Sequence, residues 1–547
     1  MKYGAGIYSA FLFGVFLAVP LHAKALFSLQ EAVQHTLQNQ WGIQVAKEEV
    51  ELRQGAVEEA KGPFDPIVAL DVSQNWWENS TKQLGLTFPE GTTFSLPLVG
   101  TVTAEGGGGF RVSGNTTGAE LRVKKRIRLG TEFALGVEVN RQKNPFFILE
   151  DPYPSFSAFQ DEYIRLAKAN VFFTIKQPLL RGFIHGRDAA SEKKNQLEYQ
   201  AAKYALAHEI SAKLLNTVEA YWDVAGAKQK LRVRKDAIKR LSVYVHDVEK
   251  LIEKNQLAKT EKMLPISSLS TAKTNELMAK QQLVVAVQHL QLSMGKAPSS
   301  SVEKVVKNNQ LDPISVEDSY CNMEQTLRKA PLIALQHRFD IRSLQERKKA
   351  AYKQVVGARN DALPDLDLRI LGRQTNRNYE QDTSLFAPFS MVSPKREISI
   401  TLSLNYPLYR SEAKGKLRGF QAEMRQIAFA LNREKAAVFS TVIDAIHEMY
   451  SLVQERKEAD TAEKQARRYV FDQQKLFRAG MTSLFQLIDA ETQLVFKEIQ
   501  HIDVRVRSAK NMARVRFLLG LFIEKKEEGY QIQEIMHLPE ELSDLCL

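Results

Sequence analysis

Apolar and polar side chains alternate with a period of two along two stretches of this chain, around Val68 and around Leu366. That period is typical of β-strands with one apolar and one polar face. Each stretch is followed by a polar loop, by a returning strand that ends at Pro178 or Pro407, and then by a long helical pattern. The first helical pattern has the three-four spacing of a coiled-coil seam, at Ile238, Leu241, Val245, Val248 and Ile252. The pattern predicts two copies of a unit in which strands lead into very long helices.

The two copies are related by a duplication. The segment Phe173–Arg181 reappears as Leu402–Arg410, and further on Gly295 faces Gly520 at a constant offset of about 225 residues. Solenoid repeats have periods of roughly 20 to 50 residues, so this is a doubled domain and not a solenoid. A helix of nearly 70 residues is about 100 Å long, whereas each return helix and each opening helix covers about half of that length. We therefore expect paired columns, each built from one long helix and two short ones.

These patterns divide the chain into a signal peptide, two repeats, a linker and a tail. The strands around Leu129-Gly130-Thr131 are an addition to the first repeat and indicate an extra hairpin. The expected boundaries are 1–25 for the signal peptide; 26–296 for the first repeat, with a helix at 28–61, strands and loops at 63–180, the extra hairpin at 119–141 and a helical hairpin at 183–295; 297–319 for the linker; 320–522 for the second repeat, with a helix at 322–361, strands at 363–409 and a helical hairpin at 411–519; and 523–547 for the tail.

Composition adds a compartment to this picture. Lys2, the apolar run 7–19 and Ala23-Lys24-Ala25 are typical of a secretory signal. Beyond it no uninterrupted apolar run reaches 18 residues, so we expect no transmembrane helix, and a membrane would have to be crossed by a closed β-barrel. The net charge of +11 comes from 75 basic and 64 acidic residues that are interspersed, which in an exported protein indicates solvated helix faces and no nucleic-acid partner. Cys321 and Cys546 stand in no metal-binding spacing, and their pairing stays open.

The strands predict an oligomer. Four to six strands per chain cannot close a barrel, because the smallest closed barrels need about eight. Three copies supply 12 strands, or 18 if the extra hairpin joins the wall, which is enough for a water-filled lumen. The fold class is thus an α+β membrane protein with a duplicated strand and long-helix repeat, whose trimeric β-barrel continues into a periplasmic coiled-coil tunnel. No nucleophile, dinucleotide, phosphate-binding or metal motif stands in its required context, so we expect neither an enzyme nor a cofactor.

Taken together, the motifs resemble the TolC-type outer-membrane efflux proteins. The segments that carry this resemblance cover nearly the whole chain after residue 25: Leu29-Gln30-Glu31-Ala32-Val33, Gln177-Pro178-Leu179-Leu180-Arg181-Gly182, Phe477-Arg478-Ala479-Gly480, Leu487-Ile488-Asp489-Ala490-Glu491 and Leu518-Leu519-Gly520. The resemblance implies a homotrimer in the outer membrane of a Gram-negative bacterium, with a 12-stranded barrel in contact with outer-membrane lipid. It also implies a periplasmic adaptor protein and an inner-membrane transporter of the RND, ABC or MFS type, in an efflux or a type I secretion system.

The same resemblance assigns candidate site residues. Asp489 and Gln486 fall where the family has an acidic periplasmic gate; the alternative for Asp489 is a solvated helix residue. Thr482 stands where a basic gate-linking residue is expected, which puts a salt-bridge lock in doubt. The helical-hairpin tips, which would dock the adaptor, and the strand-to-helix turns complete the set: Lys254, Asn255, Gln256, Arg478, Ala479, Gly480 and Met481 at the tips, and Pro178, Arg181, Pro407 and Arg410 at the turns.

A competing interpretation is a periplasmic coiled-coil adaptor or structural protein whose strands form a soluble domain. Such an adaptor would carry one helical hairpin flanked by small β-domains, whereas this sequence predicts two hairpins in one duplicated unit. We therefore expect a passive exit duct, gated at its periplasmic end. Its cargo is not encoded in any motif of the chain.

Overall fold

The computed structural model describes residues 28–81, 93–96, 100–105, 109–145, 163–184, 186–297, 323–378, 395–526 and 529–532. The predicted signal peptide, the linker beyond residue 297, Cys321 and Cys546 lie outside these ranges. The chain forms two compact units. The first comprises Met1–Val45, His208–Arg338 and Val438–Leu547, and the second comprises Ala46–Ala207 and Phe339–Ala437. The strands that the sequence predicts lie in the second unit, and both helical-hairpin tips lie in the first.

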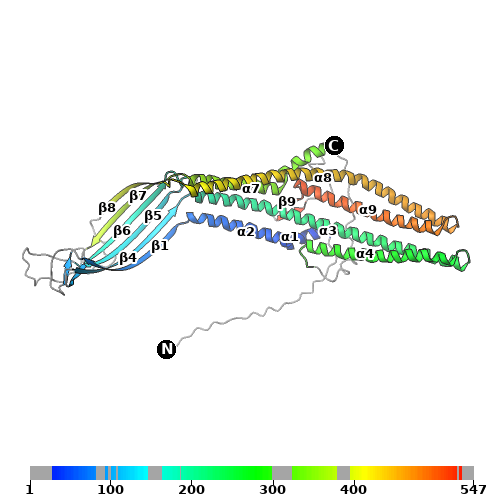
Figure 1. The fold of residues 1–547 in the computed structure, drawn as a ribbon, viewed down its shortest axis with the longest axis horizontal. Coiled ribbons are helices and arrows are strands. Elements are labelled where there is room, and N and C mark those ends of the chain that lie inside the picture. The colour runs from blue at the N-terminus through cyan, green and yellow to red at the C-terminus, as the bar shows by residue number, and fades with distance from the viewer. Residues whose placement is uncertain are drawn as a thin grey trace, which may run out of the picture. The chain divides into compact units, whose positions relative to one another are not determined.

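One antiparallel sheet dominates the second unit (Figure 1). Its long strands are β1 (Ile67–Thr81), β4 (Gly109–Arg126), β5 (Glu132–Pro145), β6 (Tyr163–Pro178), β7 (Asp365–Asn378) and β8 (Lys395–Asn405). They pair in the order β1, β4, β5, β6, β7, β8, and the short strands β2 (Thr93–Leu96) and β3 (Gly100–Glu105) extend the sheet beside β4. The extra hairpin is therefore inside the sheet, and its strands are longer than the sequence indicated.

The two faces of this sheet differ in polarity because each strand alternates. Val68 pairs with Val123, which pairs with Leu135, and the next strands continue this row with Phe173, Gly372 and Ile398. Several of these apolar side chains are exposed, with Val68 at 67% and Ile398 at 78%. An exposed apolar face on an antiparallel sheet with alternating strands is the pattern of lipid-facing strands.

The helices of the second unit either end just before a long strand or begin just after one. They are most of α2 (Trp41–Lys61), the first part of α3 (Arg187–Glu253), α7 (Phe339–Asp361) and the start of α8 (Ser411–Arg478). The 3-10 turn Gly62–Phe64, with its proline, ends α2 before β1 begins. Small residues allow close packing here: a Cβ added to Gly357 would lie 2.7 Å from the Ala190 side chain, and Ser343 donates a hydrogen bond of 2.9 Å to the carbonyl of Ala201.

The first unit is a helical bundle. It contains α1 (Leu29–Asn39), the rest of α3 and α8, the 3-10 turn η2 (Lys259–Lys262), α4 (Met263–Ser293), α6 (Met323–His337) and α9 (Leu484–Leu519). A short hairpin of β9 (Ile523–Lys526) and β10 (Gly529–Ile532) follows α9. Apolar clusters near the hairpin tips pack the bundle: Leu241 and Tyr244 pack on Leu487, and Val248 packs on Leu484 and Ile488. Each long helix and its return helix thus form a helical hairpin, as the sequence predicts.

The opening helix of each repeat is broken, which the sequence analysis did not predict. The helix expected at 28–61 is interrupted at Gln40, whose backbone is extended, and the helix expected at 322–361 is interrupted at Arg338. A tight glycine approaches each break: a Cβ on Gly295 would lie 2.4 Å from the Asn39 carbonyl oxygen, and one on Gly520 would lie 2.7 Å from the His337 carbonyl carbon. The duplication therefore includes a backbone-to-backbone contact that only glycine permits at φ +76°.

The α8 helix contains a stretch that is long and apolar enough to cross a membrane, with a mean hydropathy of 1.2. A packed core helix passes the same test, and a third of this window is buried. Along α8 the side chains of Val438, Val442, Ile446 and Leu452 are 1% exposed or less. Core packing accounts for these apolar residues.

Candidate functional site

The two helical-hairpin tips have the same turn geometry. In the first, Asn255 has φ 56° and the amide of Gln256 donates to the Leu251 carbonyl oxygen at 2.9 Å. In the second, Gly480 has φ 72° and the amide of Met481 donates to the carbonyl oxygen of Leu476 at 2.9 Å. In both turns an amide donates to the carbonyl five residues earlier, and the helix ends at a residue in the left-handed backbone conformation, which glycine and asparagine tolerate. The predicted reversals are confirmed at these residues.

The amino end of α9 is closed by a capping box. The Gln486 amide donates to Ser483 Oγ at 3.3 Å, and the Ser483 amide donates to Gln486 Oε1 at 3.4 Å. The Thr482 hydroxyl donates to Gln473 Oε1 at 2.9 Å and also contacts Gln486 Oε1. Gln486, one of the two residues predicted at the gate, therefore satisfies the first turn of a helix in this structure.

Asp489 lies one turn further along α9 and is exposed. Phe485, four residues before it, is 66% exposed, and Phe496, seven residues after it, is 59% exposed. These spacings put the three side chains on one face of the helix, opposite the buried Leu487 and Leu494. This exposed face of α9 therefore carries a carboxylate between two aromatic rings.

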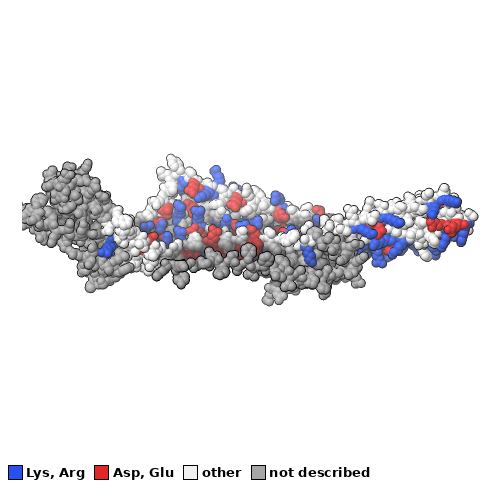
Figure 2. All heavy atoms as spheres, turned by 90° about the horizontal axis from the view of Figure 1, so that it is seen from below, with Lys and Arg blue, Asp and Glu red and all other residues white. Residues whose placement is uncertain are grey.

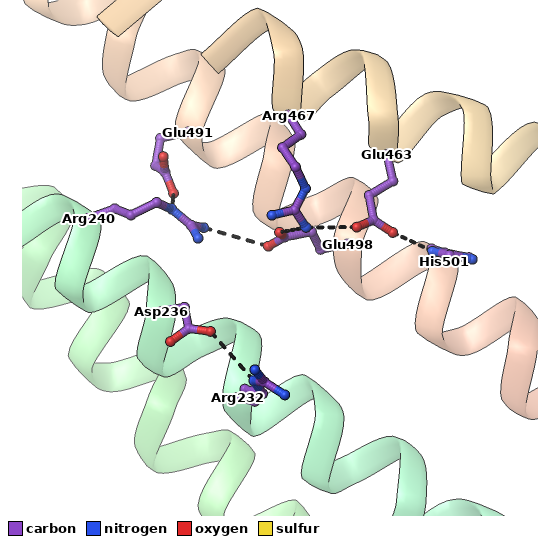
Figure 3. A network of polar contacts seen from close by, with 8 residues as sticks. All are labelled: Arg232, Asp236, Arg240, Glu463, Arg467, Glu491, Glu498 and His501. Carbon is purple, nitrogen blue, oxygen red and sulfur yellow. Dashed lines mark hydrogen bonds and ion pairs between the residues drawn. The ribbon is translucent and has the colours of Figure 1, made fainter. Parts of the chain in front are cut away.

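A chain of buried ionic contacts connects α3, α8 and α9 behind that face (Figure 3). Arg240 of α3 is paired with Glu491 of α9, and its Nη2 lies 3.6 Å from Oε2 of Glu498, seven residues further along α9. The Tyr244 hydroxyl donates to the other oxygen of Glu491 at 3.4 Å. The side chains of Glu491 and Glu498 are only 2% and 7% exposed, so their charges are compensated by protein groups and little by water.

The series of ionic contacts continues from Glu498 to side chains of α8. Nη2 of Arg467 lies 2.7 Å from Glu498 Oε1 and 2.8 Å from Glu463 Oε1, and His501 is paired with the second oxygen of Glu463. Arg467 thus bridges two carboxylates from two helices. Figure 3 also shows Arg232 and Asp236, which face each other at 3.9 Å on the surface of α3 with Arg232 86% exposed.

Burial shifts the protonation equilibria of these groups. Burial raises the pKa of Glu491 and of Glu498 above the usual value for a glutamate, although the Arg240 guanidinium opposes the shift. The pKa of Tyr244 is raised by burial and by the neighbouring carboxylate of Glu491. Burial alone would also raise the pKa of Glu463, but hydrogen bonds from Arg467 and His501 outweigh it and lower that pKa. The network therefore contains carboxyl groups whose charge is held by specific cations.

The sequence analysis missed this network, although α9 contains a signal for it. Glu491 and Glu498 are seven residues apart and occupy the same stripe as the buried Leu487 and Leu494. Charged residues at seam positions of a coiled coil are expensive unless they are paired across the interface. Two glutamates on an apolar stripe thus predict basic partners on the helices that pack against it.

Both strand-to-helix turns of the second unit are held by hydrogen bonds to backbone carbonyl groups in residues 362–366. The amide of Leu179, next to Pro178, donates to the Leu366 carbonyl at 2.8 Å, and the Arg181 amide donates to the Pro364 carbonyl at 3.3 Å. In the other turn, three residues after Pro407, Arg410 has φ 50° and its Nη1 donates to the Ala362 carbonyl oxygen at 3.0 Å. These predicted residues join strands to helices and are not part of the tip network.

A third junction fixes the β4–β5 turn. Nε and Nη2 of Arg128 donate to the two oxygens of Glu192 on α3 at 2.7 and 2.8 Å, and Arg126 pairs with Asp188 at 2.5 Å. The hydrogen bond from Arg128 lowers the pKa of Glu192. Gly130 has φ 88°, and a Cβ at this position would lie 2.2 Å from the carbonyl oxygen of Gly182. The hairpin turn is therefore in direct contact with the junction between β6 and α3.

A family model matches part of the chain, and several solved structures have a similar fold. Residues 331–521 match the family model for the outer membrane efflux protein. The structure is similar to the CmeC outer-membrane channel of Campylobacter jejuni, with 12% identity and a TM-score of 0.60 over 95% of this chain and 93% of that one. It is similar to the outer-membrane protein VceC of Vibrio cholerae, with 12% identity, a TM-score of 0.59 and coverage of 90% and 96%. The open-state MtrE outer-membrane channel of Neisseria gonorrhoeae has 13% identity, a TM-score of 0.57 and coverage of 90% and 89%. No curated protein matches.

These similarities bear on the sequence analysis. The two helical hairpins and the strands of a channel fold are present in the described chain, and neither the family nor the three similar structures is described as an enzyme. The predicted localisation, the outer membrane with an extension into the periplasm, agrees with the family match. The predicted likeness is therefore confirmed: residues 331–521 match the outer membrane efflux protein family, and the described chain has the fold of the TolC-type outer-membrane channels.

Proposed function

We propose that this protein is the outer-membrane exit duct of a tripartite efflux or type I secretion system, working as a homotrimer and a passive conduit. The observation that carries the proposal is the open sheet of the second unit. Its end strands β1 and β8 each pair on one side only among the described strands. In lipid every backbone donor and acceptor must be satisfied, so an open sheet with an exposed apolar face has to be completed by further copies.

The sheet faces support a duct. The row Asp71, Glu120, Glu138, Asn170, Thr375 and Lys395 runs across the side opposite to the apolar row. It is joined by hydrogen bonds from Asn170 Nδ2 to Glu138 Oε2 at 2.9 Å and from Thr375 Oγ1 to Asn170 Oδ1 at 2.7 Å. One polar and one apolar face is the arrangement of strands that separate water from lipid. The helix surfaces bear mixed positive and negative side chains, as solvated helices do (Figure 2).

We place the gate at Asp489. In a trimer with α9 toward the axis, three copies of Asp489 form a carboxylate ring, flanked by rings of Phe485. Charged rings select ions of opposite sign, and apolar constrictions gate by excluding water. The hairpin tips around Asn255 and Gly480 are the proposed docking points for a periplasmic adaptor, through which an RND, ABC or MFS transporter would supply the cargo.

Fractionation and mass measurement test the duct. The protein is expected in the detergent-extracted outer membrane and, after extraction, at three times the chain mass in native mass spectrometry. Recovery as a soluble monomer in the periplasm would instead support the adaptor or structural interpretation.

Single-channel recording tests the gate. Replacing Asp489 by alanine is expected to reduce the preference for cations, because the ring loses its charge. The matched control is Asp472→Ala, which removes another exposed acid of the second hairpin. Equal selectivity in wild type and Asp489→Ala would reject the gate assignment while leaving the duct intact.

A further inference from the structure

The β4–β5 hairpin is the part of the sheet that the family resemblance does not account for. A 12-stranded trimeric barrel uses four strands per chain, but the described sheet contains six long ones. The hairpin lies between β1 and β6 (Figure 1). β4 pairs with β1 from Lys124 opposite Ile67 to Phe110 opposite Thr81, and β5 pairs with β6 along its whole length. Both strands are thus hydrogen-bonded on two sides and do not form an appendage.

The outward side chains of the hairpin continue the apolar face of its neighbours. Leu121, opposite Leu70 of β1, is 47% exposed, and Leu135, opposite Phe173 of β6, is 59% exposed. A shift by one residue would move these side chains to the polar face, so this register is specific. The hairpin therefore shares the apolar face that the whole sheet exposes.

The polar face of the hairpin is likewise continuous with the polar face of the rest of the sheet. Glu120 and Glu138 are opposite each other in the polar row, and Lys124 pairs with Glu132 across the hairpin at 2.9 Å. Gly136 leaves room for the ring of Phe172, because a Cβ there would lie 2.4 Å from it. A hairpin outside a membrane wall would have no reason to keep one face apolar and the other charged in register with both neighbours.

The turn of the hairpin is also held in place. Thr131 Oγ1 donates to Gln177 Oε1 of β6 at 2.6 Å, and the Ile184 amide donates to the carbonyl oxygen of Leu129 at 3.4 Å. Together with the Arg128–Glu192 pair, these contacts fix the turn against the end of β6 and the start of α3. The hairpin is thus fixed along both edges and at its turn.

We propose that the hairpin is part of the barrel wall, so that each chain contributes six strands and three chains close an 18-stranded barrel. This inference rests on the trimeric duct proposed above. Barrel diameter grows roughly linearly with strand number, so at equal tilt the wall would be about 1.5 times as wide as one of 12 strands, with a cross-section about 2.2 times as large. Because the insertion adds two strands, β8 of one copy still runs antiparallel to β1 of the next.

Disulfide crosslinking in the outer membrane distinguishes the 18-stranded wall, which includes the hairpin, from a 12-stranded wall that leaves it out. In a background with Cys321→Ser and Cys546→Ser, the pair Leu70→Cys with Leu121→Cys joins β1 to β4, whereas Leu70→Cys with Val171→Cys, from the same row of the sheet, joins β1 to β6. In the described sheet β1 and β6 are separated by two strands, or about 14 Å at 4.8 Å per step, which is beyond the reach of a disulfide. A 12-stranded wall without the hairpin would make them neighbours.

The control pair is Ile370→Cys with Ile400→Cys, which are opposite each other on β7 and β8 in either wall. After oxidation, the β1–β4 pair is expected to crosslink as completely as the control, and the β1–β6 pair at least tenfold less. The reverse order of yields would overturn the proposal. These yields report which strands are neighbours within one chain, and they do not depend on the number of chains. Failure of the trimeric duct would be detected separately, as the absence of trimers in native mass spectrometry.

A second measurement does not depend on crosslinking. A spin label at Leu135→Cys in proteoliposomes is expected to be reached by oxygen dissolved in the lipid more than by a water-soluble nickel complex. A label preferentially reached by the nickel complex would show that β5 lies outside the lipid-facing wall and would refute the 18-stranded barrel.

Discussion

Removing the Arg240 side chain should loosen the helical-hairpin tips in a pH-dependent way. Arg240→Met leaves Glu491 and Glu498 buried, with the contact from Tyr244 to Glu491 and the pair of Arg467 with Glu498 still in place. Breaking a buried ion pair by removing one partner typically costs about 3 to 5 kcal/mol. Because the Arg240 side chain is 28% exposed and Glu498 keeps Arg467, the lower end, about 3 kcal/mol, is expected. At about 1.36 kcal/mol per factor of ten, that is roughly a 150-fold increase in the population of the opened state.

The effect should shrink as the pH falls. Burial raises the pKa of both glutamates in the folded protein, and loss of Arg240 removes a cation that opposed this rise. A carboxyl group with a raised folded pKa binds protons more strongly in the folded state, so stability is highest below the unfolded value of about 4.3 and falls as the pH rises through the folded pKa. The deficit of the variant should therefore be largest at neutral pH and small near pH 4.5.

Amide hydrogen exchange of the purified protein measures this local opening. Peptides from residues 484–498 of Arg240→Met should exchange about 150-fold faster than wild type at pH 7.5, after correction for intrinsic rates, in line with an opening cost about 3 kcal/mol lower. Arg232→Met is the matched control, because that arginine is 86% exposed and its pair with Asp236 is a surface pair expected to contribute less than about 1 kcal/mol. Equal protection in the two variants, or an equal loss at pH 7.5 and 4.5, would refute the assigned role of the network.

Three further substitutions probe the tips and the helix ends, each read out by local hydrogen exchange. Ser483→Ala removes the capping box of α9 and should destabilise its first turn by about 1 kcal/mol, whereas unchanged exchange there would contradict a stabilising cap. Leu487→Ala opens a cavity at a side chain that is fully buried and should lower the local stability by about 2 to 5 kcal/mol. A loss of stability below about 1 kcal/mol would mean that the neighbouring side chains collapse into the cavity. Gly520→Ala places a Cβ at φ +76° against the backbone of Arg338 and should destabilise the end of α9 by more than about 1 kcal/mol, with the open-space Gly415→Ala as the control.

The sequence predicted most of the elements because their periodicities are strong and repeated. Alternation at Val68 and Ile370 indicated strands, and the left-handed residues Asn255 and Gly480 marked the reversals. The breaks at Gln40 and Arg338 were missed; in the structure each lies against a glycine that is remote in sequence, Gly295 or Gly520. Tertiary contacts of this kind leave no local propensity signal.

The candidate site was predicted less completely. Asp489 is on an exposed face of α9 and its assignment as a gate stays a prediction, while Gln486 is engaged in a cap that the Ser483 spacing already permits. The network around Arg240 was not found, because its members come from three helices and pair by three-dimensional proximity. Only the glutamates on the apolar stripe of α9 signalled it.

The second unit has six long strands but only four helical segments to carry them on, from α2, α3, α7 and α8. Four of those strands lead directly to or from one of these helices, whereas the β4–β5 hairpin leads to none, so the strands outnumber their supporting helices. The paired arginines at residues 126 and 128 meet this mismatch by clamping the supernumerary turn sideways onto the first turns of α3. Ion pairs of this kind can anchor an inserted hairpin that has no helix of its own.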